Sequence, residues 1–448
     1  MIGDMSECAE PILLDDARMQ HFIDRGYVTL QSALARPYHD ELCATLERVI
    51  AAEGNPGNNL LPRIPEIALI LEDPHVTGAL ASILGPGYTM HAHRYCHVNP
   101  PGRQPTRIHT DSPQDFFHRD RWALMFYYPQ DTPPELGPTG VLPGSQFHAE
   151  RPDGIPMSKL AGDAGTFVIV HHNIWHQSTL NECERNRFML KFLFRRTAEP
   201  AGPAWRCADR NWDAPDPIRQ AMWAWHSHGE APRLGNGGTP ALAARLHDDR
   251  ESERLQAAYR LALNGNGLQA LADALTGEDD AARPAAATGL AAANEAAAGF
   301  LDPTLDDARP EVRRMATAAL GEIGPGAVGA AASLEACLDD DEGDVRLRAA
   351  RALGLIGAAD SVAALEDALR DEDEHVREHA AEALGLLTPG TDRAVTPLAR
   401  ALHDPARYVR GAAVEALRFI GTARAAERLL DYLAVSRWCP ITTKDSPY

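Results

Sequence analysis

The stretch GDAGTFVIVHHNIWHQS, from Gly162 to Ser178, decides how the first half of this 448-residue chain is interpreted. Its short apolar run, Phe167 to Val170, is bounded by turn residues, which predicts a buried strand. Three histidines follow within six residues of that run, at positions 171, 172 and 176. We therefore expect a strand whose end carries imidazole groups.

A second polar group lies upstream, at His109-Thr110-Asp111. Side chains two apart in a strand point the same way, so this imidazole and carboxylate share one side. A second imidazole from elsewhere would complete a triad of two histidines and one carboxylate, which leaves one face of Fe(II) open. The triplet alone is weak evidence, because a chain with 18 histidines contains about one by chance.

The sequence between and after these groups supports the interpretation of a metal site. LGPTGVLPGSQFH runs from Leu136 to His148, Gly162-Asp163 opens the strand, and Arg187 lies 11 residues after His176, beside a second strand-like run, FMLKFLF. In this order the elements resemble the phytanoyl-CoA dioxygenase family, over residues 12–226. The resemblance implies a double-stranded β-helix that binds Fe(II), 2-oxoglutarate and O₂.

The resemblance also implies roles for individual residues. His109, Asp111 and His176 would bind iron, with His172 as the alternative second histidine. Arg187 would pair with the distal carboxylate of 2-oxoglutarate, because its planar fork suits a carboxylate. Lesser contacts to this cosubstrate are expected from Thr110, Ser178 and Phe126.

Aromatic and imidazole side chains near these groups are candidates for a substrate pocket. The candidates are His172, Trp175, Tyr128 and His93. His91, His93 and His97 share one strand, and for each a purely structural role is the stronger expectation. For the aromatic candidates the alternative is also structural, because about half of such residues in a barrel face its outer core.

The expected activity is hydroxylation or oxidative rearrangement of a small metabolite or secondary-metabolism intermediate. The family chemistry converts 2-oxoglutarate and O₂ to succinate, CO₂ and an Fe(IV)-oxo species that abstracts a substrate hydrogen. Halogenases of this superfamily replace the carboxylate ligand with a small residue, so the presence of Asp111 favours oxygenation.

The second half of the chain repeats at intervals of 31 to 33 residues. Val-Arg pairs recur at 312, 345, 376 and 409, and Leu-Gly pairs at 320, 353 and 384, with Leu417-Arg418 in the last unit. One period shared by several features predicts stacked helix pairs that form a solenoid. The pattern resembles the short HEAT-like repeats also found in phycobilisome lyases.

These patterns predict an oxygenase domain at 1–228, a linker at 229–247, about six helix pairs at 248–435 and a tail at 436–448. Within the array, His375 and His379 lie one helical turn apart. Other repeats lack these histidines, so we expect solvated surface residues.

Composition limits the partners. The net charge of −20 disfavours nucleic acid, and no apolar stretch is long enough for a membrane helix. Seven scattered cysteines without a CxxC pair, and a start that lacks a signal-peptide pattern, favour the cytoplasm. Besides a small-molecule substrate, a protein or carrier-bound substrate docked on the repeats is the alternative, and a catalytically silent scaffold is the third.

Overall fold

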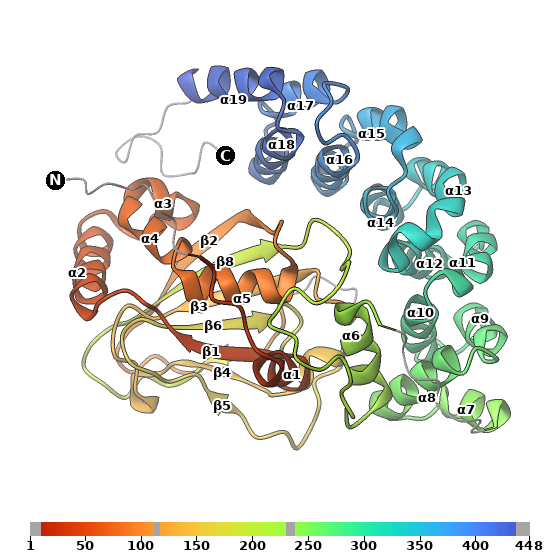
Figure 1. Ribbon diagram of the computed structural model, residues 1–448, viewed down its shortest axis with the longest axis horizontal. Helices are drawn as coiled ribbons and strands as arrows, with labels where there is room; N and C mark the ends of the chain where they lie inside the picture. The colour runs from red at the N-terminus through yellow and green to blue at the C-terminus, as the bar shows by residue number, and fades with distance from the viewer. Residues whose placement is uncertain (1–9, 112–116, 230–237, 436–448) are drawn as a thin grey trace.

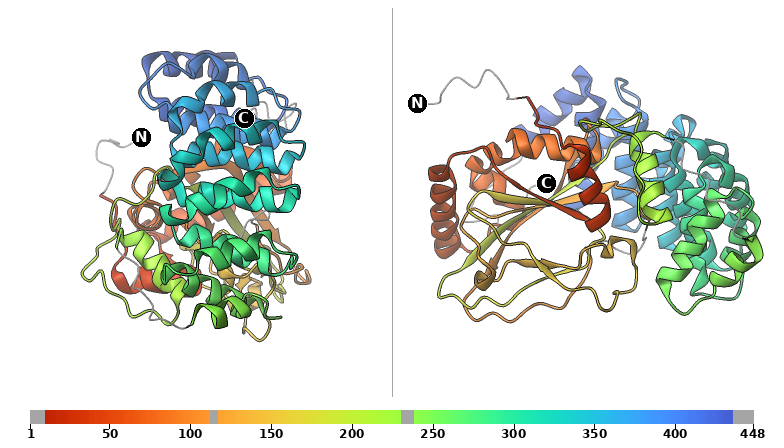
Figure 2. Two further views of the ribbon diagram at one scale, coloured as in Figure 1. Left: turned by 90° about the vertical axis from the view of Figure 1, so that its right-hand side faces the viewer. Right: turned by 60° about the horizontal axis from the view of Figure 1, so that its bottom comes forward.

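The computed structural model describes residues 10–111, 117–229 and 238–435. The first half contains two antiparallel β-sheets with flanking helices, and the second half is an arc of paired helices that curves around one side of it (Figures 1 and 2). The predicted combination of a β-rich first half and a helical repeat region is therefore present.

The larger sheet has five strands, all antiparallel to their neighbours, and the smaller sheet has three. In spatial order, the larger sheet consists of β1 (Tyr27–Gln31), β6 (Thr166–His171), β3 (Trp122–Tyr127), β8 (Arg187–Arg195) and β2 (Thr89–Asn99). The smaller sheet consists of β5 (Ser158–Lys159), β4 (Thr139–Val141) and β7 (His176–Ser178). The two apolar runs predicted as strands form most of β6 and β8.

The larger sheet has two buried faces, because successive residues of a strand point to opposite sides. Met125 and Tyr127 belong to one core with the helices of the first half, whereas Leu124 and Phe126 belong to another. That second core also contains Val141 of the smaller sheet, so the two sheets pack face to face. The helices of the first half are α1 (Asp16–Arg25), α2 (Arg36–Glu53), α3 (Leu60–Arg63), α4 (Ala68–Leu71), α5 (Pro74–Leu84) and α6 (Pro217–Ser227).

The helical arc has an inner row that faces the sheets and an outer row (Figure 1). The inner row is α8 (Glu251–Leu263), α10 (Ala282–Ala292), α12 (Pro310–Ile323), α14 (Gly343–Ile356), α16 (Glu374–Leu387) and α18 (Arg407–Ile420). The outer row is α9 (Leu268–Thr276), α11 (Glu295–Leu301), α13 (Ala331–Ala336), α15 (Val362–Ala368), α17 (Val395–Ala401) and α19 (Ala423–Val435). The segment expected as a linker contains α7 (Thr239–Arg245), which packs on α8, while residues 230–237 and the expected tail lie outside the described residues.

The repeated Leu-Gly pairs mark close contacts between neighbouring inner helices. A Cβ atom added to Gly354 would lie 2.8 Å from the Cα and Cβ atoms of Ala383 on the next helix, and one added to Gly385 would lie 2.7 Å from Ala416 Cα. Side chains larger than hydrogen therefore do not fit there. Arg418 occupies the same repeat position in the last unit, where no further inner helix follows within the described residues.

The repeated Val-Arg pairs connect one repeat to the next. Arg346 binds both carboxylate oxygens of Asp371 in the following repeat, at 2.8 and 3.1 Å. Arg313 and Arg377 make the same bidentate contact with Asp340 and Asp404. Each of these aspartates also accepts a backbone N–H at the start of its own inner helix. We call this series of contacts the Arg–Asp ladder.

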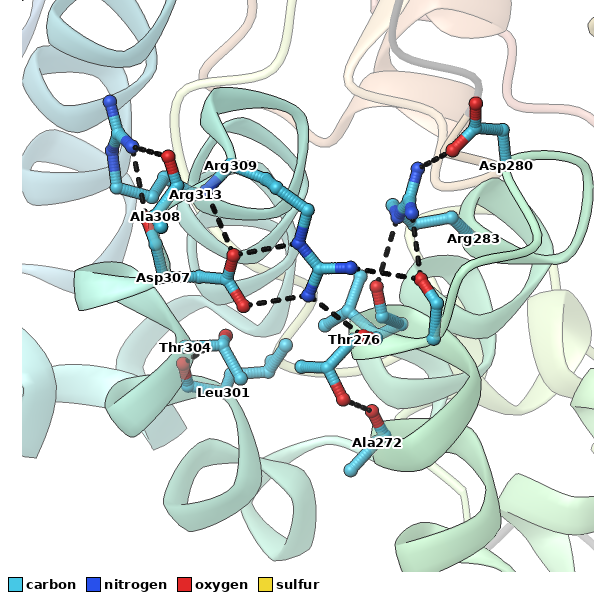
Figure 3. Close-up of polar contacts among 12 residues, drawn as sticks. Ala272, Thr276, Asp280, Arg283, Leu301, Thr304, Asp307, Ala308, Arg309 and Arg313 are labelled. Carbon is cyan, nitrogen blue, oxygen red and sulfur yellow. Dashed lines mark hydrogen bonds and ion pairs between the residues drawn. The ribbon is translucent and has the colours of Figure 1, made fainter.

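Figure 3 shows a different contact between repeats, in which Arg309 joins two neighbouring units. Its guanidinium binds both carboxylate oxygens of Asp307 and also donates to the backbone oxygen of Thr276, at 2.7 Å, at the end of α9. The acidic turns of the repeats thus link neighbouring units through ion pairs and hydrogen bonds, in addition to capping helices.

The inner row contacts the first half through polar side chains. The buried Arg121 binds Glu322 of α12 at 2.8 Å, and Arg195 binds Glu382 of α16 at 2.7 Å. The concave side of the array therefore lies against the rest of the chain. No single helix among the described residues is long and apolar enough to span a membrane, while one bent pair, Pro65–Leu71 with Pro74–Leu84, passes that test together.

Candidate metal centre

His109 and His176 are held together by their backbones. Each residue donates its N–H to the carbonyl oxygen of the other, at 3.0 and 2.8 Å, in an antiparallel bridge. Residues paired in this way present their side chains on the same face. The two imidazole rings accordingly lie 4.5 Å apart between centroids, although 67 positions separate them in the sequence.

The same two histidines direct one ring nitrogen toward a shared point. Nδ1 of His109 lies 3.0 Å from the carbonyl oxygen of Arg107, and Nδ1 of His176 lies 3.0 Å from that of Ile174. A carbonyl accepts only from an N–H, so both Nδ1 atoms carry the proton and both Nε2 atoms keep a lone pair. This is how metal-binding histidines are usually oriented.

Asp111 completes the group. Its two carboxylate oxygens lie 3.8 Å from His109 Nε2 and 3.5 Å from His176 Nε2. The three possible ligand atoms all lie within 4.8 Å of one another. Two imidazoles and one carboxylate that converge from one side match the donor set of non-haem Fe(II) sites.

Lys191, which we did not predict as a site residue, contacts this group directly. Its ammonium lies 2.5 Å from Asp111 Oδ2, and its side chain is 8% exposed. Burial alone would raise the pKa of Asp111, but the charge and the hydrogen bond of Lys191 outweigh it and hold the pKa below its ordinary value. The sequence contained a usable signal, because Lys191 lies four residues after Arg187 and therefore on the same face of one strand.

Arg187 lies deeper on that face and is almost fully buried, at 2% exposure. Its guanidinium donates to the carbonyl oxygens of Gly137, at 3.1 Å, and His97, at 3.3 Å. No carboxylate in the described residues pairs with it, and burial lowers its pKa. A buried cation without a counter-ion is costly, which fits a site that receives an acidic ligand.

The three lesser cosubstrate candidates lie around this group. The ring of Phe126 lies 5.8 Å from that of His176, between centroids. Ser178 accepts the N–H of Thr106 at 3.2 Å, and Thr110 lies half-buried between the two ligands of its motif. Tyr128, a substrate-pocket candidate, contributes to the electrostatic environment of Arg187, and its hydroxyl accepts the N–H of Thr139.

The other substrate-pocket candidates divide into two groups. His172 and His93 lie on the side of the sheet that bears the metal group, and burial, the largest effect, lowers their pKa values to about 3 and about 4. Both are therefore neutral at pH 7. Trp175 instead donates its indole N–H to the carbonyl of His148, at 2.9 Å, and the contacts of its side chain do not bring it to the metal group.

The donor set fits Fe(II), and Arg187 fits the distal carboxylate of 2-oxoglutarate. His109, Asp111 and His176 would supply three ligand atoms, and a facial triad of this kind would leave one side of the metal to the cosubstrate and O₂. Arg187 is the one buried cation of this face that lacks an acidic partner among the described residues.

Comparison with solved structures gives partial likenesses. The chain is similar to the non-heme alpha ketoglutarate dependent carbocyclase SnoK from nogalamycin biosynthesis, with 18% identity, a TM-score of 0.36, and coverage of 42% of this chain and 87% of that one. The non-heme monooxygenase ThoJ, as its Ni complex, is 19% identical with a TM-score of 0.34, over 42% of this chain and 82% of that one. AviO1 from Streptomyces viridochromogenes is 17% identical with a TM-score of 0.35, over 42% of this chain and 96% of that one.

The repeat region has a clearer assignment. A search of curated proteins gave no match. The family model for HEAT repeats matches residues 268–346 and 331–418, and the model for the PBS lyase HEAT-like repeat matches residues 409–434. The stretch 268–434 therefore consists of HEAT repeats.

Proposed function

We propose that this protein is an Fe(II)- and 2-oxoglutarate-dependent oxygenase of the phytanoyl-CoA dioxygenase type, whose two facing sheets form a double-stranded β-helix. The observation that supports it best is the convergence of His109 Nε2, His176 Nε2 and Asp111 on one point, beside the unpaired buried Arg187. When bound, the metal would let O₂, which is the oxidant, react with 2-oxoglutarate: one oxygen atom ends in succinate as CO₂ leaves, and the other is available to oxidise the substrate.

The residues of the chain prepare this chemistry. The bridge between His109 and His176 fixes the spacing of the two imidazoles before a metal arrives. Lys191 donates to Oδ2 of Asp111 and holds this carboxylate in its ionised form, which would leave Oδ1 available to bind the metal. Arg187 orients the cosubstrate by its distal carboxylate, in a part of the sandwich that is closed to water. The substrate is expected to be a small molecule that is hydroxylated or oxidatively rearranged.

Metal and cosubstrate binding test this proposal without knowledge of the substrate. In anaerobic calorimetry, the full chain is expected to bind one Fe(II) ion, and then 2-oxoglutarate only when the metal is present. His109→Ala should weaken Fe(II) binding by more than the roughly 10- to 100-fold that loss of an outer contact causes. His375→Ala is the matched control, because His375 is an exposed histidine of the array, with 58% of its side chain exposed.

Turnover provides the second readout. Succinate release with Fe(II), 2-oxoglutarate and ascorbate, measured across a panel of small molecules, should be lost in His109→Ala and retained in His375→Ala. Unchanged Fe(II) affinity in His109→Ala protein would refute the metal assignment.

A further inference from the structure

His97 of β2 lies between two cationic residues of the neighbouring strand β8. In the register of these two strands, His97 is directly opposite Met189. Arg187 precedes Met189 by two positions, and Lys191 follows it by two. Residues two apart in a strand share a face, and so do residues directly opposite each other. The imidazole of His97 is therefore roughly 7 Å along the strands from the level of each cation.

The two cations on either side of His97 mark the two ends of the proposed cosubstrate. Lys191 binds Asp111, a candidate metal ligand, whereas Arg187 has no carboxylate partner among the described residues. Arg187 also approaches His97 directly, because its guanidinium donates to the carbonyl oxygen of His97 at 3.3 Å. A 2-oxo acid that chelates the metal and reaches Arg187 with its second carboxylate has to pass the level of His97.

The side chain of His97 has an unused hydrogen-bonding group. Its Nε2 is buried and has no hydrogen-bond partner among residues 10–111, 117–229 and 238–435. Burial, together with the charges of Lys191 and Arg187, lowers the pKa of His97 to about 3, so the ring is neutral at pH 7. A neutral imidazole has one N–H and one lone pair, and Nε2 can carry the proton. A buried polar atom costs free energy unless a ligand or water completes its hydrogen bond.

The surroundings of this nitrogen favour an anionic acceptor. Arg187 supplies a positive charge that no described carboxylate matches, while the charge of Lys191 is matched by Asp111. A carboxylate accepts several hydrogen bonds at once, so it can take one from a guanidinium and one from an imidazole. The ring of Tyr95 packs edge-on against that of His97, with 5.1 Å between centroids, and holds the imidazole in place.

We propose that His97 is a second anchor for 2-oxoglutarate, with its Nε2–H donating to the distal carboxylate that Arg187 binds. This inference rests on the proposed function, because Arg187 and the candidate metal centre define where the cosubstrate lies. The purely structural role expected for this histidine leaves Nε2 without a partner, whereas the cosubstrate supplies one.

Calorimetry on the Mn(II)-loaded full chain tests this contact with two ligands. 2-Oxopentanoate keeps the 2-oxo acid end of 2-oxoglutarate and lacks its distal carboxylate. His97→Phe keeps a ring of similar size against Tyr95 but has no N–H. This variant is expected to bind 2-oxoglutarate roughly 10-fold more weakly and 2-oxopentanoate as tightly as the parent chain does. Equal weakening for both ligands, or weakening for neither, would overturn the inference.

Two further variants separate a lost hydrogen bond from a disturbed fold. His97→Gln has an amide N–H in place of the imidazole N–H and should recover much of the affinity for 2-oxoglutarate. His375→Phe is the matched control, because His375 is a histidine of the array with 58% of its side chain exposed, and it should change neither affinity. Urea denaturation shows whether each variant is folded as stably as the parent chain.

The imidazole of His97 also gives a spectroscopic readout that a structural role would not move. In the full chain with isotope-labelled histidine, the nitrogen resonances of His97 are assigned by their absence in His97→Gln. In the Zn(II)-loaded chain, 2-oxoglutarate is expected to fix the proton on Nε2 and to shift that resonance, and 2-oxopentanoate is not. An Nε2 that stays unprotonated with 2-oxoglutarate bound would overturn the inference.

The outcomes distinguish this inference from the proposed function. If the parent chain shows no metal-dependent binding of 2-oxoglutarate, both are overturned. If the parent chain binds 2-oxoglutarate and Arg187→Met weakens that binding while His97→Phe does not, this inference alone is overturned.

Discussion

The Arg–Asp ladder and the candidate metal centre use arginine differently. In the HEAT array, Arg313, Arg346 and Arg377 each bind both oxygens of an aspartate in the next repeat. In the sheet half, Arg187 is more deeply buried, yet no carboxylate among the described residues pairs with it. A charge that the fold has satisfied indicates a structural contact. A buried charge that lacks a counter-ion, on the same strand face as the candidate metal ligands, is the one that we assign to a ligand.

The largest effect is expected at Arg187, where a substitution tests whether the unpaired charge binds a ligand. Arg187→Met should weaken 2-oxoglutarate binding on the order of 100-fold, near 3 kcal/mol, because a charge-assisted bidentate contact is lost. The free energy of unfolding should not fall, since the change removes an uncompensated buried charge. Calorimetry on the Mn(II)-loaded chain and urea denaturation measure the two quantities. Unchanged 2-oxoglutarate affinity would remove Arg187 from the site.

The opposite pattern is expected in the Arg–Asp ladder. Arg346→Met leaves Asp371, whose side chain is 11% exposed, without its partner. The free energy of unfolding should fall by about 2 kcal/mol, between the values for exposed and fully buried pairs. Urea denaturation followed by circular dichroism checks this, and 2-oxoglutarate affinity should stay unchanged. A variant as stable as the parent would show that the ladder is incidental to stability.

A smaller effect on stability is expected from a substitution at the close contact between two inner helices, and a matched control makes this test specific. Gly354→Ala would place a methyl group 2.8 Å from Ala383 and should cost about 1 to 3 kcal/mol in unfolding free energy. Gly299→Ala is the matched control, because Gly299 is also helical but has no atom within 4 Å of the added Cβ. It should leave stability unchanged or raise it by up to about 1 kcal/mol. Equal thermal midpoints for the two variants would contradict the close-packing explanation.

The smallest effect is the pH dependence of the contact between Arg309 and Asp307. The hydrogen bonds from Arg309 lower the pKa of Asp307 from 3.8 to about 2. A depressed pKa in the folded state means that the contribution to stability is complete above pH about 4 and is lost as the pH falls through about 2. Urea midpoints measured across this range should fall less steeply in Asp307→Asn than in the parent chain. If the urea midpoints of the two proteins fell equally steeply with pH, the Arg309–Asp307 contact would not be the cause of the lost stability.

Much of the fold was predictable because its signals are local or periodic. The HEAT region follows from Val-Arg and Leu-Gly pairs at one spacing, and each pair proves to have a physical reason, a ladder contact or a close approach. The apolar runs around Ile169 and Leu190 form strands as expected. The grouping of His109, Asp111 and His176 was expected from the family resemblance, and the geometry brings these three residues together.

Other features were not predictable, because they depend on how distant segments meet. Nothing near Tyr408 in the sequence indicates that it lies against His93, 315 positions earlier. His379 was expected to be a solvated surface residue, yet it is only 21% exposed and contacts Glu382 at the junction of the two halves. The inner helices have different partners in the first half, since α8 contacts α6 whereas α18 contacts β2, and so the positions that make these contacts carry no periodic signal.

The arginine at position 418 has a consequence for the size of the array. Every earlier inner helix from α12 onward has glycine at this point of the repeat, where the next unit comes within contact of the backbone. A side chain as large as arginine would prevent a further unit from stacking there. Stacking a grafted repeat on α18 in the same way would therefore first require the substitution Arg418→Gly.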